Sequence, residues 1–325
     1  MKAVVNDRYG APQVLRYVDV DDPVAGEGEV LVRVRAAAVN PPDWAGVHGV
    51  PFVARMGFGL FRPRIPIRGT DLAGVVAAVG EKASRFAVGD EVFGTGVGTF
   101  AELAVAKQEH LVTKPPTLSF EQAAATGMAA LTALQALRDA GRIQSGQQVL
   151  IVGAGGGIGT FAVQIAKALG AQVTGVCSES KRSLVLSLGA DEVIDYAVAD
   201  FTAGERRFDL VLDNVLQHPL SRLLRVVKRD GTLVPNGGQY YKRWIASSAV
   251  LLLQAPLLGL VVPQHIRVCM QRVDGADLKF LRDLVECGKL LPVVGRTYPL
   301  REAAEAIARF GDGHSMGKCI LVPGG

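Results

Sequence analysis

Cysteine is scarce in this chain, which has four thiols in 325 residues, at positions 177, 269, 287 and 319. No two of them form a CxxC pair, so the sequence contains neither a disulfide framework nor a zinc ribbon. Because thiols without such a framework are typical of reducing compartments, we expect a cytoplasmic protein. The first ten residues predict the start of a strand and not a signal peptide.

Clustered positive charge is also lacking. The formal net charge is +4, and the lysines and arginines are spread along the chain without a basic block. This distribution argues against nucleic-acid binding. Histidine is equally sparse, with five residues that show no metal-ligand spacing, although His48 is a candidate to face a substrate.

The remaining composition is that of a globular protein, with 49% hydrophobic and 20% charged residues. The length allows two domains with substantial cores. Residues 1 to about 120 predict strands, and Val30–Arg35 alternates apolar and polar positions as a half-buried strand does. After Lys114–Pro116 the pattern changes to alternating strands and helices, which predicts a parallel sheet.

The most informative stretch is residues 147–178, which predict a strand, a glycine turn, a helix and a second strand. Glycines allow a tight turn and let the backbone N–H groups of the next helix approach a pyrophosphate. The context of this turn matches a dinucleotide site of the Rossmann type. The residues predicted to form it are Gly153, Ala154, Gly155, Gly156, Gly157, Ile158 and Gly159.

The end of the second strand indicates which dinucleotide is bound. NAD sites usually place a carboxylate there to bind the ribose 2′-hydroxyl. This chain has Ser178 followed by Lys181 and Arg182, which suit the 2′-phosphate of NADPH. Glu179 is the competing feature, since it would favour NAD, and Ser178 as a simple helix N-cap is a further alternative. We therefore predict NADPH as the cofactor.

Residues 244–262 form a strongly apolar run that is long enough for a membrane span. Gln254 and Pro256 interrupt it, and no second run of this kind exists. We interpret the run as a buried helix, a subunit contact or the wall of an apolar pocket, with membrane contact as the minor alternative.

Several motifs together resemble the medium-chain dehydrogenase/reductase superfamily, and most closely its zinc-free quinone-oxidoreductase-like branch. The resemblance covers nearly the whole chain and rests on Ala38–Trp44, Gly69–Val76, Phe86–Gly94, Leu131–Leu137, Cys177–Ser178, Val193–Tyr196 and Gly317–Lys318. It implies a doubly wound parallel α/β sheet in residues 122–287. It also implies a β-rich GroES-like catalytic domain made of residues 1–121 and 288–325, in a protein that we expect to be a homodimer.

The zinc enzymes of this superfamily carry a cysteine and a His-Glu pair in the two N-terminal motifs, where this chain has Asn40 and Thr70–Asp71. Without thiolate or imidazole, no zinc site with three protein ligands is expected there. The resemblance then implies hydride transfer from NADPH to a quinone or another α,β-unsaturated carbonyl. The alternatives are a non-catalytic NADPH-binding interaction protein and an enoyl-thioester reductase.

The resemblance also implies roles for residues outside the glycine turn. Asn40 is a candidate oxyanion donor, or else a turn residue before Pro41. Asp43 is expected at the substrate mouth together with Trp44. Thr126 and Thr132 match helix positions that contact the nicotinamide or a phosphate, with helix packing as the alternative.

The other expected cofactor contacts lie later in the chain. Tyr196 matches a family tyrosine near the adenosine phosphate, or simply ends a strand. Asn214, Gly237 and Gly238 follow predicted strands at the carboxyl edge, where open sheets bind ligands. Lys318 is expected either to reach the cofactor or to lie at the surface.

Overall fold

The protein is described from a computed structural model, in which residues 1–52, 55–236, 254–255, 257–313 and 315–324 are placed. Two compact units make up the chain. The first unit contains Met1–Leu131, Val273–Gly288 and Pro292–Gly325, and the second contains Thr132–Arg272 and Lys289–Leu291. We expected domain edges at 121/122 and 287/288. The bounds of the first unit differ because it includes the start of the helix Phe120–Gln135 and the whole of the helix Gly275–Glu286.

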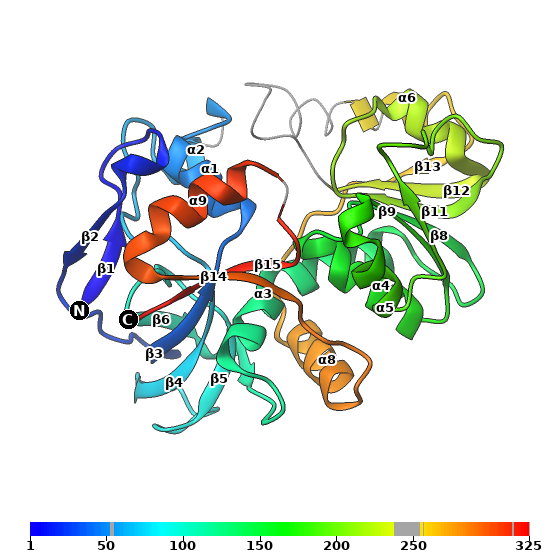
Figure 1. The fold of residues 1–325 in the computed structure, drawn as a ribbon. Helices are drawn as coiled ribbons and strands as arrows, with labels where there is room; N and C mark the ends of the chain where they lie inside the picture. The colour runs from blue at the N-terminus through cyan, green and yellow to red at the C-terminus, as the bar shows by residue number, and fades with distance from the viewer. Residues whose placement is uncertain (53–54, 237–253, 256, 314, 325) are drawn as a thin grey trace. The chain divides into compact units, whose positions relative to one another are not determined.

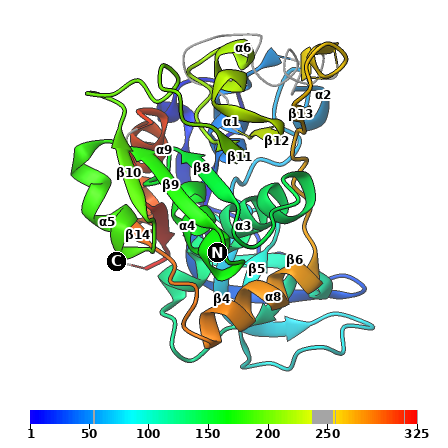
Figure 2. The same cartoon turned by 90° about the vertical axis from the view of Figure 1, so that its right-hand side faces the viewer.

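The second unit is built on a parallel sheet. Its strands are β8 (Gln148–Val152), β9 (Gln172–Cys177), β10 (Glu192–Asp195), β11 (Phe208–Asp213), β12 (Val227–Pro235) and β13 (His265–Ile266). They pair in the order β10-β9-β8-β11-β12-β13, and every pair is parallel (Figure 2). The strand order reverses direction between β8 and β11, as in the doubly wound folds that bind dinucleotides. This confirms the predicted fold class.

Short helices accompany this sheet. They are α4 (Gly157–Ala168), α5 (Arg182–Ser187), α6 (Leu220–Leu223), the 3₁₀ turns η5 (Glu179–Lys181) and η6 (Leu224–Val226), and the π-helical turn η4 (Ala136–Ala140). One core cluster joins the sheet to the α6 region through Leu150, Val211, Phe208, Leu223 and Leu233, all buried. Continuous burial of both sheet faces explains why these strands read as apolar runs.

The apolar run 244–262 is described only at residues 254–255 and 257–262. Leu258 and Val262 pack against the core cluster of the second unit, whereas Leu257, Leu260 and Val261 are exposed. The described part of the run is therefore a surface segment with one buried side. In the portion of the chain that is placed, we find no helix with the length and hydropathy needed to cross a bilayer.

The first unit is mainly antiparallel. Its strands are β1 (Lys2–Val5), β2 (Arg16–Asp19), β3 (Glu29–Ala38), β4 (Asp71–Val79), β5 (Glu91–Thr95), β6 (Leu103–Lys107), β7 (Leu111–Thr113), β14 (Val294–Pro299) and β15 (Lys318–Val322). β14, β15, β3, β4, β5 and β7 follow one another in a sheet in which β6 also pairs with β3, while β1 and β2 form a separate pair (Figure 1). In β3, Val30, Val32 and Val34 are buried and alternate with outward residues, as the sequence predicts.

The first unit also contains α-helices and 3₁₀ turns. They are η1 (Pro12–Val14), α1 (Pro41–His48), α2 (Arg55–Phe58), η3 (Gln108–His110), the first part of α3 (Phe120–Gln135), α8 (Gly275–Glu286), η7 (Leu300–Glu302) and α9 (Ala303–Gly311). α8 packs so closely on η3 that a Cβ at Gly275 would lie 2.5 Å from the carbonyl oxygen of Glu109. Through this contact α8 belongs to the first unit, which no motif in the sequence indicated.

Candidate functional site

The glycine turn joins β8 to α4 at the point where the strand order reverses. Gly153 has a φ of +77°, a conformation that favours glycine. A Cβ at Gly159 would lie 2.1 Å from the carbonyl oxygen of Gly153, so the first turn of α4 lies directly against the glycine turn. Glycine is therefore required at both positions for the turn to close.

The start of α4 is open to a ligand. Gly156 is its N-cap in extended conformation, and no side chain caps the helix there. The first N–H groups of an α-helix have no acceptor within the helix, and together with the helix dipole they favour an anion. A Cβ at Gly156 would meet only the carbonyl oxygen of Gly153, at 3.3 Å. Residues 156–159 thus provide a backbone cradle that fits a pyrophosphate.

Ala154 and Gly155 connect the glycine turn to β9 and to the residues that follow it. Ala154 is fully buried, and its N–H donates to the carbonyl oxygen of Val176, which ties the turn to β9. A Cβ at Gly155 would lie 2.7 Å from Cδ of Lys181. The stem of Lys181 therefore packs over the turn, and a side chain at position 155 would displace it.

The end of β9 brings the predicted 2′-phosphate residues to the same sheet edge. The hydroxyls of Ser178 and Ser180 are 3.0 Å apart. Tyr196 follows β10, half exposed, with its N–H donated to the carbonyl oxygen of Cys177 at 3.4 Å. Burial lowers the pKa of Lys181, so its ammonium lies in a partly desolvated position.

Glu179 and Arg182 are bound to each other. Arg182 Nε donates to Glu179 Oε2 at 2.7 Å, and another nitrogen of the guanidinium donates to the carbonyl oxygen of Val193 at 3.0 Å. The guanidinium of Arg182, which the sequence suggested as a second phosphate contact, is therefore bound to Glu179 and to a backbone carbonyl in this structure. The same ion pair engages the carboxylate that would favour NAD.

Two asparagines lie at the carboxyl edge of the next strands. Asn214 follows β11, and its amide donates to the carbonyl oxygen of Val152 at 3.2 Å, beside the start of the glycine turn. Asn236 follows β12 and donates from Nδ2 to Oδ1 of Asn214 at 2.8 Å. The sequence analysis did not identify Asn236 as a site residue, although its position directly after the fifth predicted strand could have indicated it. Gly237 and Gly238, predicted to act here, lie outside the described residues.

In the first unit, Asn40 lies in a buried network of charged and polar groups. Its Nδ2 donates to Asp71 Oδ2 at 2.9 Å and to the carbonyl oxygen of Ala38 at 3.2 Å, and its Oδ1 accepts from Lys318 Nζ at 2.5 Å. Both amide hydrogens are therefore already donated within the protein. This does not support the expected role of Asn40 as an oxyanion donor, and it makes the residue a structural link.

Lys318 is buried, which contradicts the alternative that it lies at the surface. It is 4% exposed, and its ammonium donates to Asn40 and to the carbonyl oxygen of Val39, 3.8 Å from Asp71 Oδ2. Asp71 also accepts the backbone N–H of Met128 in α3 at 2.8 Å. Burial lowers the pKa of Lys318 and raises the pKa of Asp71, and their mutual attraction opposes both shifts. The network fastens β15, α1, β4 and α3 together.

Asp43 is likewise turned inward and does not line an open mouth. It is 4% exposed and accepts the N–H of Asn40 at 2.8 Å and that of Gly69 at 3.2 Å, so it caps the start of α1. Burial raises the pKa of this carboxyl to about 7. Trp44 is also buried and stacks on His48, with ring centroids 3.8 Å apart.

The two threonines of α3 are both buried. Thr126 donates its hydroxyl to the carbonyl oxygen of Gln122 at 3.0 Å, which corresponds to the packing role left open by the sequence. Thr132 lies in the part of α3 that belongs to the second unit. The structure therefore brings together the residues of the glycine turn, Ser178, Lys181, Tyr196 and Asn214, and separately Asn40, Asp43 and Lys318.

Zinc does not fit the first-unit network. The positions of the two N-terminal motifs supply an amide and carboxylates, and a buried ammonium already neutralises them. Across the described residues, no group of three or more histidines, cysteines or carboxylates has a geometry that holds a metal ion. Thiolate and imidazole, the usual zinc ligands, are absent from the network itself.

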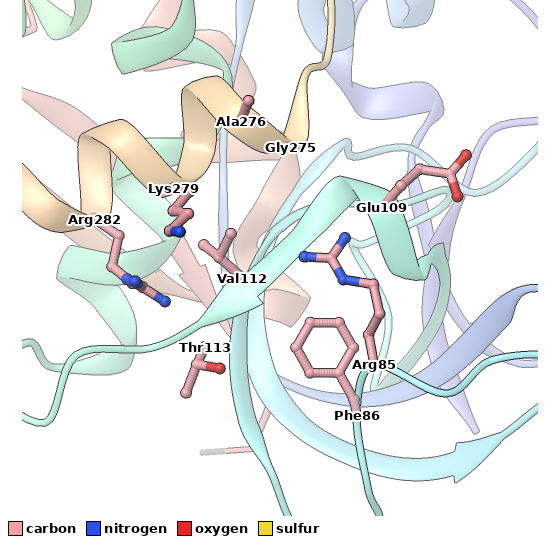
Figure 3. A pocket seen from close by; sticks show the side chains of 9 residues that line it. All are labelled: Arg85, Phe86, Glu109, Val112, Thr113, Gly275, Ala276, Lys279 and Arg282. Atoms are coloured by element: carbon pink, nitrogen blue, oxygen red, sulfur yellow. The ribbon is translucent and has the colours of Figure 1, made fainter.

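A cavity of about 400 Å³ occurs elsewhere in the first unit, between α8 and the η3–β7 segment (Figure 3). Its charged lining consists of Arg85, Lys279 and Arg282 together with one carboxylate, Glu109, and its apolar lining includes Phe86 and Val112. None of the predicted site residues lies there. The cavity is therefore distinct from both groups described above.

Comparison with known proteins agrees with this architecture. The family description "Alcohol dehydrogenase GroES-like domain" matches residues 26–116, and "Zinc-binding dehydrogenase" matches residues 188–321. The mouse protein named NAD(P)H oxidoreductase RTN4IP1, mitochondrial, is 32% identical over 99% of this chain and 89% of its own length. Human quinone oxidoreductase is 31% identical over 99% and 98%.

Solved structures show the same likeness. The Coxiella burnetii quinone oxidoreductase has a TM-score of 0.85 at 28% identity and covers 99% of both chains. The Escherichia coli quinone oxidoreductase complexed with NADPH has a TM-score of 0.84 at 25% identity and covers 99% of this chain and 100% of its own. A GroES-like unit joined to a doubly wound nucleotide-binding unit defines a dehydrogenase or reductase class. The chain belongs to the medium-chain dehydrogenase/reductase superfamily, in its quinone-oxidoreductase-like branch.

Proposed function

We propose that this protein is an NADPH-dependent oxidoreductase that reduces a quinone or another α,β-unsaturated carbonyl without a metal ion. The observation that carries the proposal is the packing of Lys181 over the glycine turn, with a Cβ at Gly155 placed 2.7 Å from its stem. A cation next to a pyrophosphate cradle, at the end of the second strand, suits a phosphorylated ribose.

The residues of the second unit have separate roles toward the dinucleotide. The N–H groups at the start of α4 bind the pyrophosphate, and Lys181 with Ser178 binds the 2′-phosphate. The carboxylate of Glu179 accepts from Arg182 at 2.7 Å, so a ribose hydroxyl would have to compete with this ion pair. Asn214 is oriented by Asn236 and by the carbonyl oxygen of Val152, which fixes a polar group at the carboxyl edge of the sheet. When bound, the nicotinamide supplies the hydride.

The class of hydride acceptor is inferred from the side chains that the first unit offers as possible metal ligands. Because these groups do not fit zinc, an unactivated alcohol or ketone would lack a Lewis acid to polarise it. A quinone or enone accepts a hydride at carbon without one, since its conjugated oxygen stabilises the negative charge. The human and Coxiella relatives carry the name quinone oxidoreductase, which supports the same class.

The proton that completes the reaction is assigned to water. Asn40 has no amide hydrogen to spare, and Asp43 and Lys318 are buried and hydrogen-bonded within the first unit. We therefore propose that the first unit contributes shape and rigidity to catalysis, without a general acid from this network.

The test is NADPH oxidation with a panel of quinones, enones and enoyl thioesters. We expect turnover with quinones or enones that persists after dialysis against a zinc chelator. Turnover with the thioesters alone would assign the enoyl-reductase alternative. Binding of NADPH without turnover of any acceptor would instead support the non-catalytic interaction protein.

A further inference from the structure

The segment between α1 and β4 exposes an unusual number of large apolar side chains. Phe52, Met56, Leu60, Phe61 and Ile65 have exposed fractions of 57%, 73%, 46%, 88% and 50%. Apolar residues scattered singly over a surface need no explanation, but a group of this density in one short segment indicates an interaction site.

The exposed side chains are carried by a folded knob, which we define as Phe52 and residues 55–65. The backbone N–H of Arg64 donates to the carbonyl oxygen of Phe58 at 2.7 Å, and Tyr9 donates its hydroxyl to the carbonyl oxygen of Gly59 at 2.5 Å. Within the knob, Pro63 is buried. The exposure is therefore a property of an ordered element of the first unit.

The charge of the knob has one sign. The chain contains no Asp or Glu between Asp43 and Asp71, whereas Arg55, Arg62 and Arg64 lie in the knob. Arg62 and Arg64 are exposed and form no ion pair with any described residue. Arg55 stacks over the rings of Tyr9 and Phe52, at 4.4 and 5.1 Å from their centroids. Exposed apolar groups next to unpaired arginines match the chemistry of an anionic lipid surface.

We propose that the knob docks the protein on the surface of an anionic lipid bilayer, with Phe61 and Leu60 inserted among the headgroups and Arg62 and Arg64 on lipid phosphates. A protein partner fits the arginines less well, because it would have to supply both carboxylates and an apolar groove. The proposal does not depend on the run 244–262 or on the reaction that the protein catalyses.

The experiment is co-sedimentation of the full chain with phosphatidylcholine vesicles that contain or lack phosphatidylglycerol. We expect binding to the anionic vesicles only, and weaker binding at high salt because the charge term is screened. The double variants Leu60→Ser/Phe61→Ser and Arg62→Ser/Arg64→Ser should each lower the partition by about tenfold, from lost apolar burial and lost charge respectively.

Two control variants test whether the loss of vesicle binding is specific to the knob or follows from any substitution of an exposed residue. Val24 is 87% exposed, as apolar as the knob residues, but lies among Asp21, Asp22 and Glu27, so Val24→Ser should leave the partition unchanged. Arg16 is exposed but paired with Asp7 at 2.7 Å, so Arg16→Ser should also have no effect.

Two outcomes would overturn the proposal. The first is the absence of binding to anionic vesicles by the unmodified protein, and the second is binding that the two double variants leave unchanged. If vesicle binding is absent but the double variants change the KM for a water-soluble quinone or the mass in solution, the knob would be assigned to substrate entry or to contact between copies of the chain.

Discussion

At the scale of single residues, the most consequential feature is a lysine that the fold keeps out of water. Lys318 and Asp71 are 4% and 0% exposed, and Asn40 links them by accepting from one and donating to the other. Burying two charges is costly, and the cost is offset only while each remains paired and hydrogen-bonded. The sequence did not reveal this pairing, since the residues lie far apart in the chain and lysine is usually a surface residue.

Removing the buried cation should therefore be strongly destabilising. We expect Lys318→Met to lower the free energy of unfolding by about 3 kcal/mol, because Asp71 is left without its counter-charge. Denaturant titration measures this change. Lys82→Met removes an exposed lysine that pairs with Glu27 at 2.5 Å and should cost less than about 0.5 kcal/mol. If both variants lose the same small amount, the buried network has no special role.

A second variant distinguishes lost charge pairing from lost packing. Adding Asp71→Asn to Lys318→Met removes the unpaired carboxylate, so the double variant should recover about 1 kcal/mol or more relative to the single one. A double variant less stable than Lys318→Met would show that packing, and not charge, accounts for the first loss.

Asp43 predicts a distinctive pH dependence. Its pKa in the folded protein is about 7, above the ordinary value of 3.8, because burial disfavours the charged form. The folded state then binds this proton more tightly than the unfolded state, so the residue's contribution to stability falls as pH rises from 3.8 to about 7 and is constant above. Asp43→Asn, which cannot ionise, should remove this part of the slope.

The measurement is the free energy of unfolding of both proteins at several pH values across that window. The stability advantage of the native protein over Asp43→Asn should shrink as the pH rises. An advantage that grows with pH would mean that the two N–H donors at Asp43 lower its pKa in the folded state, contrary to this account.

At the scale of elements, the site depends on how the glycine turn meets α4. The sequence predicted this unit because its signals are local: an apolar strand, closely spaced glycines and a helical repeat within 32 residues, 147–178. It also predicted the alternation in β3 for the same reason. The position of α8 on η3 could not be foreseen, since it depends on the close approach of Gly275 to Glu109 and on no pattern within α8 itself.

Two alanine substitutions in the turn should affect different properties, stability in one case and NADPH affinity in the other. Gly159→Ala puts a Cβ 2.1 Å from the Gly153 carbonyl oxygen and should destabilise the protein by about 1–3 kcal/mol. Gly156→Ala meets nothing closer than 3.3 Å and should change stability by less than about 1 kcal/mol. Its added methyl group would instead obstruct a bound pyrophosphate, and we expect the NADPH affinity to fall by about tenfold.

Thermal unfolding and nucleotide titration of the two variants measure both quantities. If Gly156→Ala is stable and binds NADPH with native affinity, the start of α4 does not bind the pyrophosphate as proposed. A Gly159→Ala protein of native stability would show that the turn tolerates movement that this geometry does not allow.

At the scale of the whole molecule, the family, the fold class and the arrangement of the second unit were predictable, because each of them depends on motifs that are continuous in the sequence. The first-unit site was predicted only in part. Asn40 and Asp43 were recognised as members of a motif, but their partners Asp71, Lys318 and Gly69 come from other segments, and only the folded chain shows that their polar groups are used internally.

We propose that the cation at the end of the second strand, Lys181, selects the phosphorylated dinucleotide. The most direct measurement is calorimetric titration of the native protein and of Lys181→Ala with NADPH and with NADH, with Lys228→Ala as the control because that lysine pairs with Asp209 at 2.8 Å. We expect the native protein to bind NADPH more tightly than NADH, Lys181→Ala to lose about tenfold in affinity for NADPH alone, and Lys228→Ala to show no change. Equal losses for both nucleotides, or no heat with either one, would contradict it.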